Sequence, residues 1–309
     1  MMIAIVGCGA MGSLFGALLA RAGHAVWMVD NHPERAQVMA SQGIRVETPN
    51  GDFGVNLSAT ADPAVVPEPR FIFIFVKAYD TAAAAETAAV FAAPETSLVT
   101  LQNGLGNVEA LVRRFRPARI IAGTTAQGAT ELGPGRVRHA GFGLTVMGSA
   151  TGPPNEPVEE LANTLRGAGL EVALTDDVTS AIWSKLVVNC GINAVGALTR
   201  LPNGAVVADA GAAAVLSAAV QEAAAVAAAK GIALACGAPV EHAKQVCRAT
   251  ARNVNSMLQD MLRQRRTEVN AINGALARAG DEVGVATPVN DALAALVGAV
   301  ERGYARQAS

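Results

Sequence analysis

A lysine and two asparagines recur at every fourth position in one apolar stretch of this chain. Lys185, Asn189 and Asn193 follow an i, i+4, i+8 spacing, which places them on one face of a helix expected over residues 178–197. Their neighbours are mostly apolar, so a plain solvated face is not expected. A lysine in an apolar cleft loses hydration, which lowers its pKa and suits it to donate a proton near neutral pH. The alternative, a surface lysine with two packing asparagines, stays open on these residues alone.

Two further polar clusters could complete such a site. Asn253 and Ser256 lie in a segment expected to be helical, and Glu268 follows. Asparagine and serine can hold a carboxylate or hydroxyl in place, whereas Glu268 could pair with Lys185 or accept a hydrogen bond from a hydroxyl. Asn103 stands at the carboxyl end of an expected strand, the edge where open α/β sheets bind ligands. Taken singly, segment 253–268 is only a polar helix face.

The N-terminal glycines predict a dinucleotide site. An apolar strand expected over 3–6 runs into Gly7, Gly9 and Gly12, and a helix follows at once. In this setting the first glycine allows a sharp turn, the second lets the backbone approach a pyrophosphate, and the third lets the helix pack on the strand. A glycine turn without a ligand is the alternative. The candidate cofactor contacts in this loop are Gly7, Cys8, Gly9, Ala10, Met11 and Gly12.

An acidic residue closes the second expected strand, at 25–29. Asp30 stands where an acidic side chain accepts a hydrogen bond from an unphosphorylated ribose 2′-hydroxyl and repels a 2′-phosphate, so it favours NAD(H). It could instead cap the next helix, for which Pro33 would suit the first turn.

Composition limits the class of partner. The chain has 309 residues, 51% of them apolar and 16% charged, with a net charge of −2. This balance allows two domains with large cores and gives no reason to expect nucleic acid or a membrane as partner, so the ligand should be small. The first strand follows no basic or apolar leader, so we expect a cytoplasmic protein. The four cysteines lack metal-ligand spacing, and no metal site is predicted.

The order of expected elements predicts an α/β protein with two domains. Short β-branched runs alternate with helical segments as far as Leu174, which is typical of a Rossmann-type, doubly wound parallel sheet. Glycine turns within 131–148 predict an antiparallel pair added to that sheet. We therefore expect a dinucleotide-binding domain at 1–175 and an all-α substrate and catalytic domain at 176–309. The strands are expected at 3–6, 25–29, 71–76, 97–101, 120–124 and 171–174, and the later helices at 178–197, 204–229, 239–264, 267–279 and 288–304.

Together these segments resemble the ketopantoate reductase (2-dehydropantoate 2-reductase) family over nearly the whole chain. The glycine loop is common to many proteins. The later segments are more specific, because they join a Lys-x3-Asn-x3-Asn helix to a Ser-Met-Leu-Gln-Asp and Thr-Glu pair at the family's spacing. The matching segments are GCGAMG at 7–12, FVKAYD at 75–80, QNGLG at 102–106, KLVVNCGINAVGAL at 185–198, NSMLQD at 255–260 and RRTEVNAING at 265–274.

The resemblance implies a role for each matching residue. Lys185 corresponds to the general acid that protonates a ketone oxygen as hydride arrives from the nicotinamide. Glu268 corresponds to an acidic residue beside both substrate and nicotinamide ribose, and Asn103 to an asparagine that touches both cofactor and substrate. Lys77 corresponds to a lysine near the cofactor, and Gly128 matches loosely a stretch of backbone that contacts it. The substrate's carboxylate and hydroxyl would be held by Asn189, Asn193, Asn253 and Ser256.

The resemblance and Asp30 disagree about the cofactor. The family usually uses NADP(H), commonly with a basic residue near this position, and Arg35 lies one helical turn beyond Asp30. Both NADP(H) and NAD(H) therefore stay open.

The expected activity is reduction of ketopantoate to pantoate, as in pantothenate biosynthesis. Two alternatives stay open: the same chemistry on a different 2-keto acid, and a non-catalytic redox sensor that binds a dinucleotide. The Ala-rich helical region could also supply a face for homo-oligomer formation.

Overall fold

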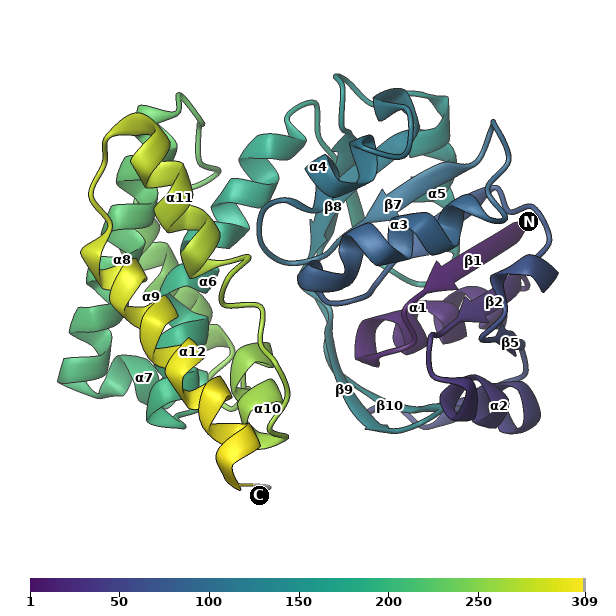
Figure 1. The fold of residues 1–309 in the computed structure, drawn as a ribbon, viewed down its shortest axis with the longest axis horizontal. Coiled ribbons are helices and arrows are strands. Elements are labelled where there is room, and N and C mark those ends of the chain that lie inside the picture. The colour runs from purple at the N-terminus through teal and green to yellow at the C-terminus, as the bar shows by residue number, and fades with distance from the viewer. Residues whose placement is uncertain (308–309) are drawn as a thin grey trace. The chain divides into compact units, whose positions relative to one another are not determined.

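The chain forms two compact units. A computed structural model describes residues 1–307 (Figure 1). The first unit comprises Met1–Gln102 and Asn107–Val178. The second comprises the loop Asn103–Gly106 and the chain from Thr179 onward, so four residues that follow a strand of the first unit belong with the helices of the second.

An eight-stranded sheet organises the first unit and confirms the doubly wound α/β fold. Its strands are parallel except for β11, which runs antiparallel to β8, and β12, which pairs in parallel with β11. Strand β1 lies between β2 and β6, so the strand order reverses there. In sheet order the strands are β12 (Val172–Leu174), β11 (Thr145–Ser149), β8 (Ile120–Thr125), β7 (Ser97–Thr100), β6 (Phe71–Ile74), β1 (Met2–Val6), β2 (Ala25–Val29) and β5 (Ser58–Thr60).

Helices cover both faces of this sheet. Side chains alternate between faces along a strand, and the central strand β6 divides accordingly: Phe71 and Phe73 join one apolar cluster, whereas Ile72 and Ile74 join another. The first cluster includes Phe15 of α1, and all four β6 residues are fully buried. An all-apolar strand is the pattern required by a strand covered on both faces. The helices are α1 (Ala10–Arg21), α2 (Pro33–Gln42), α3 (Thr81–Ala89), α4 (Asn107–Val112) and α5 (Glu156–Gly167), with short 3-10 turns η1 (Pro63–Val65), η2 (Ala78–Asp80) and η3 (Pro117–Arg119).

A second, four-stranded sheet is present, and the expectation of an antiparallel strand pair within 131–148 added to the main sheet is wrong. The two segments expected to pair with each other became β10 and β11, and they lie in different sheets. Strand β10 pairs with β9 and β3, whereas β11 pairs antiparallel with β8 at the edge of the main sheet. The physical reason is apolar packing against α1 and α2, since Val137 and Val46 are fully buried in one cluster with Phe15 and Met39. The order is β4 (Phe53–Val55), β3 (Ile44–Glu47), β10 (Arg136–Gly141) and β9 (Gly128–Gly133).

The second unit is helical, and its helices are more broken than expected. The helix expected at 204–229 is interrupted at Asp209, whose Oδ1 accepts a hydrogen bond from the amide of Ala212 at 2.8 Å and so caps a new helix. The helix expected at 239–264 is likewise divided, because Asn255 caps a second segment. The helix expected from 267 begins at Asn273. The helices are α6 (Val178–Thr199), α7 (Asn203–Ala208), α8 (Ala210–Ala229), α9 (Pro239–Ala249), α10 (Ser256–Leu262), α11 (Asn273–Val283) and α12 (Pro288–Gln307).

Helices α6 and α8 form much of the core of this unit. By length and composition alone both are apolar enough to cross a membrane, a test that the core helices of globular domains also pass. They pack closely at Gly191, where an added Cβ would lie 2.7 Å from the Val220 side chain and 3.0 Å from Leu216. Val220 and Leu216 are both fully buried, so α6 and α8 bury their apolar surfaces against each other.

Candidate functional site

The glycine loop separates glycines needed for packing from one that is not. Gly7 has a φ of +97°, and an added Cβ would lie 2.6 Å from the Val76 amide nitrogen. A Cβ on Gly12 would lie 2.0 Å from the Gly7 carbonyl oxygen. Gly9 has an ordinary φ of −71°, and a Cβ there would meet nothing within 4 Å. Backbone strain and packing therefore do not explain why residue 9 is a glycine. The close approach of a ligand to the backbone does explain it.

The start of α1 suits an anion. The first intrahelical bond runs from the Ser13 amide to the Gly9 carbonyl at 2.9 Å, so the amides of Ala10, Met11 and Gly12 have no acceptor within the helix. The first turn carries no acidic residue, and Gly9 makes no side-chain cap. The loop also stands where the strand order reverses. These features fit the pyrophosphate of a dinucleotide.

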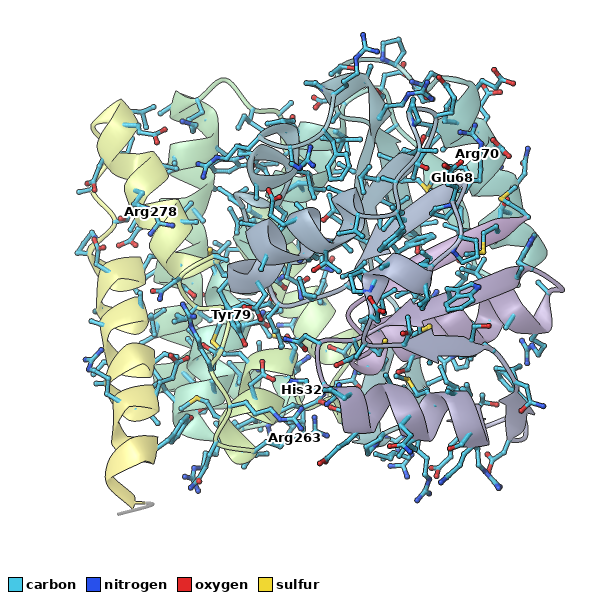
Figure 2. The ribbon with its side chains drawn as sticks, turned by 45° about the vertical axis from the view of Figure 1, so that its right-hand side comes forward. His32, Glu68, Arg70, Tyr79, Arg263 and Arg278 are labelled. Atoms are coloured by element: carbon cyan, nitrogen blue, oxygen red, sulfur yellow. The ribbon has the colours of Figure 1, made fainter. Side chains whose placement is uncertain are left out.

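Asp30 is tied both to the glycine loop and to the residue that precedes helix α2. Its side chain is 5% exposed, Oδ2 accepts a hydrogen bond from the Cys8 amide at 3.1 Å, and Oδ1 accepts one from the His32 amide at 2.9 Å. His32, labelled in Figure 2, is the N-cap residue of α2, so Asp30 is not the cap itself but accepts a hydrogen bond from the backbone of that residue. Burial, with Asp30 next in effect, raises the pKa of the Cys8 thiol, which stays neutral beside the loop.

Arg35 is held by two carboxylates. Its Nη2 lies 3.0 Å from Glu131 Oε1, and its Nη1 lies 3.8 Å from Asp30 Oδ2. Nη1 also donates to the Cys8 carbonyl at 3.3 Å. Sequence reasoning missed Glu131, which reaches this cluster from β9 of the second sheet; no local pattern could have indicated it.

A polar network supports the loop that carries Lys77. Gln102 Nε2 donates to the Val76 carbonyl at 2.7 Å and to the Thr81 hydroxyl at 2.9 Å. Gln102 therefore joins the chain just after β7 to Val76, the residue before Lys77, and Lys77 is the N-cap of the turn η2. Gln102 was not among the sequence candidates, although it stands beside Asn103 in the strand-end motif.

Packing explains the glycine at position 128, since a Cβ added there would lie 3.0 Å from the Gly141 amide nitrogen.

The polar stripe on α6 lies partly inside the second unit. Asn193 is 5% exposed, and Lys185 and Asn189 are partly buried. Burial lowers the pKa of Lys185 to about 8, while the carboxylate of Glu268 opposes that shift. Glu268 is itself 8% exposed. An amine with this pKa can both give and take a proton near neutral pH.

Asn255 joins the start of α10 to α6. Its Oδ1 accepts a hydrogen bond from the Leu258 amide at 2.9 Å, and its Nδ2 donates to the Ile192 carbonyl at 3.4 Å. Gly196 leaves room for this contact, since a Cβ there would lie 2.4 Å from Asn255 Nδ2. The adjoining candidates Asn253 and Ser256 are exposed, and Asn255 fixes the chain between them against the turn of α6 that carries Asn193.

The loop that carries Asn103 lies against the segment that follows Glu268. The Leu105 amide donates to the Ala271 carbonyl at 2.9 Å. Gly104, with a φ of +85°, permits this approach, because an added Cβ would lie 2.5 Å from the same carbonyl oxygen. The expected site residues thus divide by unit. The first unit contains the glycine loop, Asp30, Lys77 and Gly128, and the second contains Lys185, Asn189, Asn193, Asn253, Ser256, Glu268 and Asn103.

Comparison with known proteins agrees across both units. The family described as ketopantoate reductase PanE/ApbA matches residues 3–152, and its C-terminal counterpart matches residues 177–301. The 2-dehydropantoate 2-reductase of Halobacterium salinarum is 37% identical over 303 residues, covering 98% of this chain and 99% of its own length.

Solved structures give the same result. A PanE/ApbA family ketopantoate reductase from Ralstonia eutropha superposes with a TM-score of 0.90 at 34% identity, covering 98% of this chain and 99% of its own. A D-mandelate dehydrogenase in a ternary structure with NADH and anilino(oxo)acetate superposes with a TM-score of 0.93 at 28% identity and the same coverage. On the strength of both family regions and the full-length relatives, this chain belongs to the ketopantoate reductase family of NAD(P)-dependent oxidoreductases.

Proposed function

We propose that this enzyme reduces ketopantoate to pantoate with Lys185 as the general acid and NADH as the favoured reductant. The observation that carries the proposal is the amine of Lys185, whose pKa burial lowers to about 8 beside the buried carboxylate of Glu268. Under this proposal residues 1–175 bind the dinucleotide, and residues 176–309 supply the acid and hold the substrate.

Proton delivery falls to Lys185. When bound, the reduced nicotinamide supplies a hydride to the carbonyl carbon of the keto acid. Charge then develops on the carbonyl oxygen, where the Lys185 ammonium stabilises it and transfers one proton, leaving a neutral amine and the hydroxy acid. The carboxylate of Glu268 favours the protonated amine before the reaction.

Neutral donors of the second unit would orient the substrate. The side chains of Asn189, Asn193, Asn253 and Ser256 offer amide and hydroxyl donors to a carboxylate and a hydroxyl, and Asn103 would contact both substrate and cofactor. Holding the keto acid in one orientation presents a single face of its carbonyl. Because these groups recognise a carboxylate and a hydroxyl, the remainder of the substrate is chosen by other walls of the site.

The cofactor would lie along the glycine loop, with its adenosine ribose at Asp30. The amides at the start of α1 suit the pyrophosphate, and Asp30 favours an unphosphorylated ribose. The proposed cofactor contacts are Gly7, Cys8, Gly9, Ala10, Met11, Gly12, Asp30, Lys77, Asn103, Gly128 and Glu268.

A different 2-keto acid is the second candidate substrate. The similarity to a D-mandelate dehydrogenase supports this candidate. That protein has the same fold and was solved with NADH, the unphosphorylated cofactor, and with anilino(oxo)acetate, whose acyl group differs from that of ketopantoate. We further propose a cytoplasmic enzyme, with homo-oligomer formation through the Ala-rich helices to be tested by sedimentation.

A matrix of initial rates tests the proposal. NADH and NADPH are each assayed against ketopantoate and a few shorter or aromatic 2-keto acids. The proposal expects the highest kcat/KM with NADH and ketopantoate. A higher value with another keto acid selects the second candidate, and a higher value with NADPH contradicts the assignment of Asp30.

A further inference from the structure

Glu131 and Arg35 form an ion pair between two distant parts of the first unit. Arg35 lies in α2 and Glu131 in β9, and their Nη2 and Oε1 atoms are 3.0 Å apart. The pair is largely sheltered from solvent, with side-chain exposures of 21% for Arg35 and 12% for Glu131. A sheltered pair is screened less by salt than a surface pair, so its geometry and charge balance matter to anything bound beside it.

The cluster around Arg35 holds more negative than positive charge. Asp30 and Glu131 approach the guanidinium from two sides, and the Cys8 carbonyl accepts from Nη1 at 3.3 Å. Both terminal nitrogens are therefore engaged by groups of the protein itself. Two carboxylates around one guanidinium leave a net negative charge next to the end of β2.

This arrangement bears on a cofactor's 2′-phosphate. In dinucleotide-binding folds the acidic residue at this strand end accepts from the ribose 2′-hydroxyl, whereas a nearby arginine accommodates a 2′-phosphate. Arg35 lies 3.8 Å from Asp30 and is the candidate for such an arginine in this chain. A 2′-phosphate carries about −1.5 to −2 charges at neutral pH and needs a guanidinium whose charge is not already neutralised.

We infer that Glu131 is a specificity-determining residue: by holding and neutralising Arg35, it withholds that guanidinium from a 2′-phosphate and reinforces selection of NADH over NADPH. The inference rests on the proposed placement of the adenosine ribose at Asp30. It adds that the selection depends on a residue of the second sheet.

The test uses equilibrium binding to the whole enzyme without turnover. Calorimetry measures the Kd of 2′,5′-ADP, which carries the 2′-phosphate, and of 5′-ADP, which does not, for the wild type and for Glu131→Gln. The substitution keeps the side-chain shape and removes its charge. We expect binding of 2′,5′-ADP to tighten by at least about fivefold, and that of 5′-ADP to change by less than about twofold, because only the former gains from an unneutralised guanidinium.

Two further variants make the result specific. Glu47→Gln is the matched control, since Glu47 also pairs with arginines on the second sheet, Arg136 and Arg138, and it should leave both Kd values unchanged. Adding Arg35→Gln to Glu131→Gln should abolish the gain. The inference is overturned if Glu131→Gln brings no selective gain, or if the gain survives without Arg35.

These outcomes are separable from failure of the proposed cofactor preference. That preference is judged on the wild type, by whether NADH exceeds NADPH in kcat/KM. A wild type that prefers NADPH contradicts the assignment of Asp30, whereas the role of Glu131 is judged by the change in 2′,5′-ADP binding between variants.

Discussion

The carboxylate of Glu268 opposes the effect of burial on the amine of Lys185. Burial lowers the pKa of the amine, Glu268 raises it, and the balance leaves it at about 8. An unperturbed lysine near 10.4 would stay charged throughout the physiological range. At about 8 the same group can change its protonation state during a catalytic cycle.

This pKa predicts opposite pH dependences for the two directions of reaction. Reduction needs the protonated amine, so kcat/KM for keto-acid reduction should fall as pH rises through about 8. Oxidation of the hydroxy acid needs the neutral amine, so its kcat/KM should rise through the same pH. Initial rates from pH 6 to about 10 in both directions check this. If kcat/KM changed in the same direction with pH for reduction and for oxidation, a single acid–base group could not be responsible.

Substituting Glu268 should change the pH at which kcat/KM for reduction falls, called here the limb of the pH profile. In Glu268→Gln the opposing carboxylate is lost, so the pKa of Lys185 falls further and the limb for reduction shifts to lower pH. Glu282→Gln is the control, because Glu282 is an exposed glutamate of the same unit that pairs with Lys230. Its pH profile should match that of the wild type. An unshifted limb in Glu268→Gln would separate Glu268 from Lys185.

Two glycines of the loop should respond differently to alanine. Gly12→Ala places a Cβ 2.0 Å from a backbone oxygen, so thermal unfolding should reveal a loss of stability. Overpacking of this kind costs about 1–3 kcal/mol. Gly9→Ala meets no protein atom within 4 Å and should keep the wild-type Tm, but weaken NADH binding by at least about tenfold because its methyl group obstructs the pyrophosphate. Tight NADH binding by Gly9→Ala would place the pyrophosphate elsewhere.

Asn255 should act as a positioning residue. Asn255→Ala removes both a helix cap and the bond to Ile192, so a loss of about 1–3 kcal/mol in stability and a raised KM for the keto acid are expected. NADH affinity should stay unchanged. Asn155→Ala removes a comparable cap at the start of α5 and controls for capping alone, since it should lower stability without raising this KM. Equal KM values in the two variants would leave Asn255 a purely structural role.

Local patterns predicted the main sheet well. The run Phe71–Ile74 is apolar at every position, and the glycine loop joins strand to helix, so both could be assigned from neighbouring residues. Strands β3, β4 and β5 were not predicted, because they lack the continuous buried run of the equally short β6. Strand β3 is buried only at alternate positions, and β4 and β5 contain no fully buried residue. The second sheet was not predicted for a different reason. Its strand β10 is held by burial of Val137 in one apolar cluster with Phe15, and these residues are far apart in the sequence.

In the candidate site, too, local patterns predicted some features, whereas others depend on contacts between distant segments. A fixed spacing placed Lys185, Asn189 and Asn193 on one helix, and a helix has the same periodicity wherever it packs. The division of the later helices depended on the caps supplied by Asp209 and Asn255, and polar side chains of this kind are also found inside helices. The pairing of Arg35 with Glu131 depends on how β9 folds over α1, which sequence order does not reveal.

The proton-donor role of Lys185 is tested most directly by the turnover of Lys185→Met with NADH and ketopantoate, measured beside its Kd for NADH. We expect kcat to fall by about 10²-fold or more while the Kd for NADH is unchanged, because general-acid catalysis contributes about 10²–10⁴-fold. Near-normal turnover by this variant would contradict the assignment of Lys185 as the proton donor.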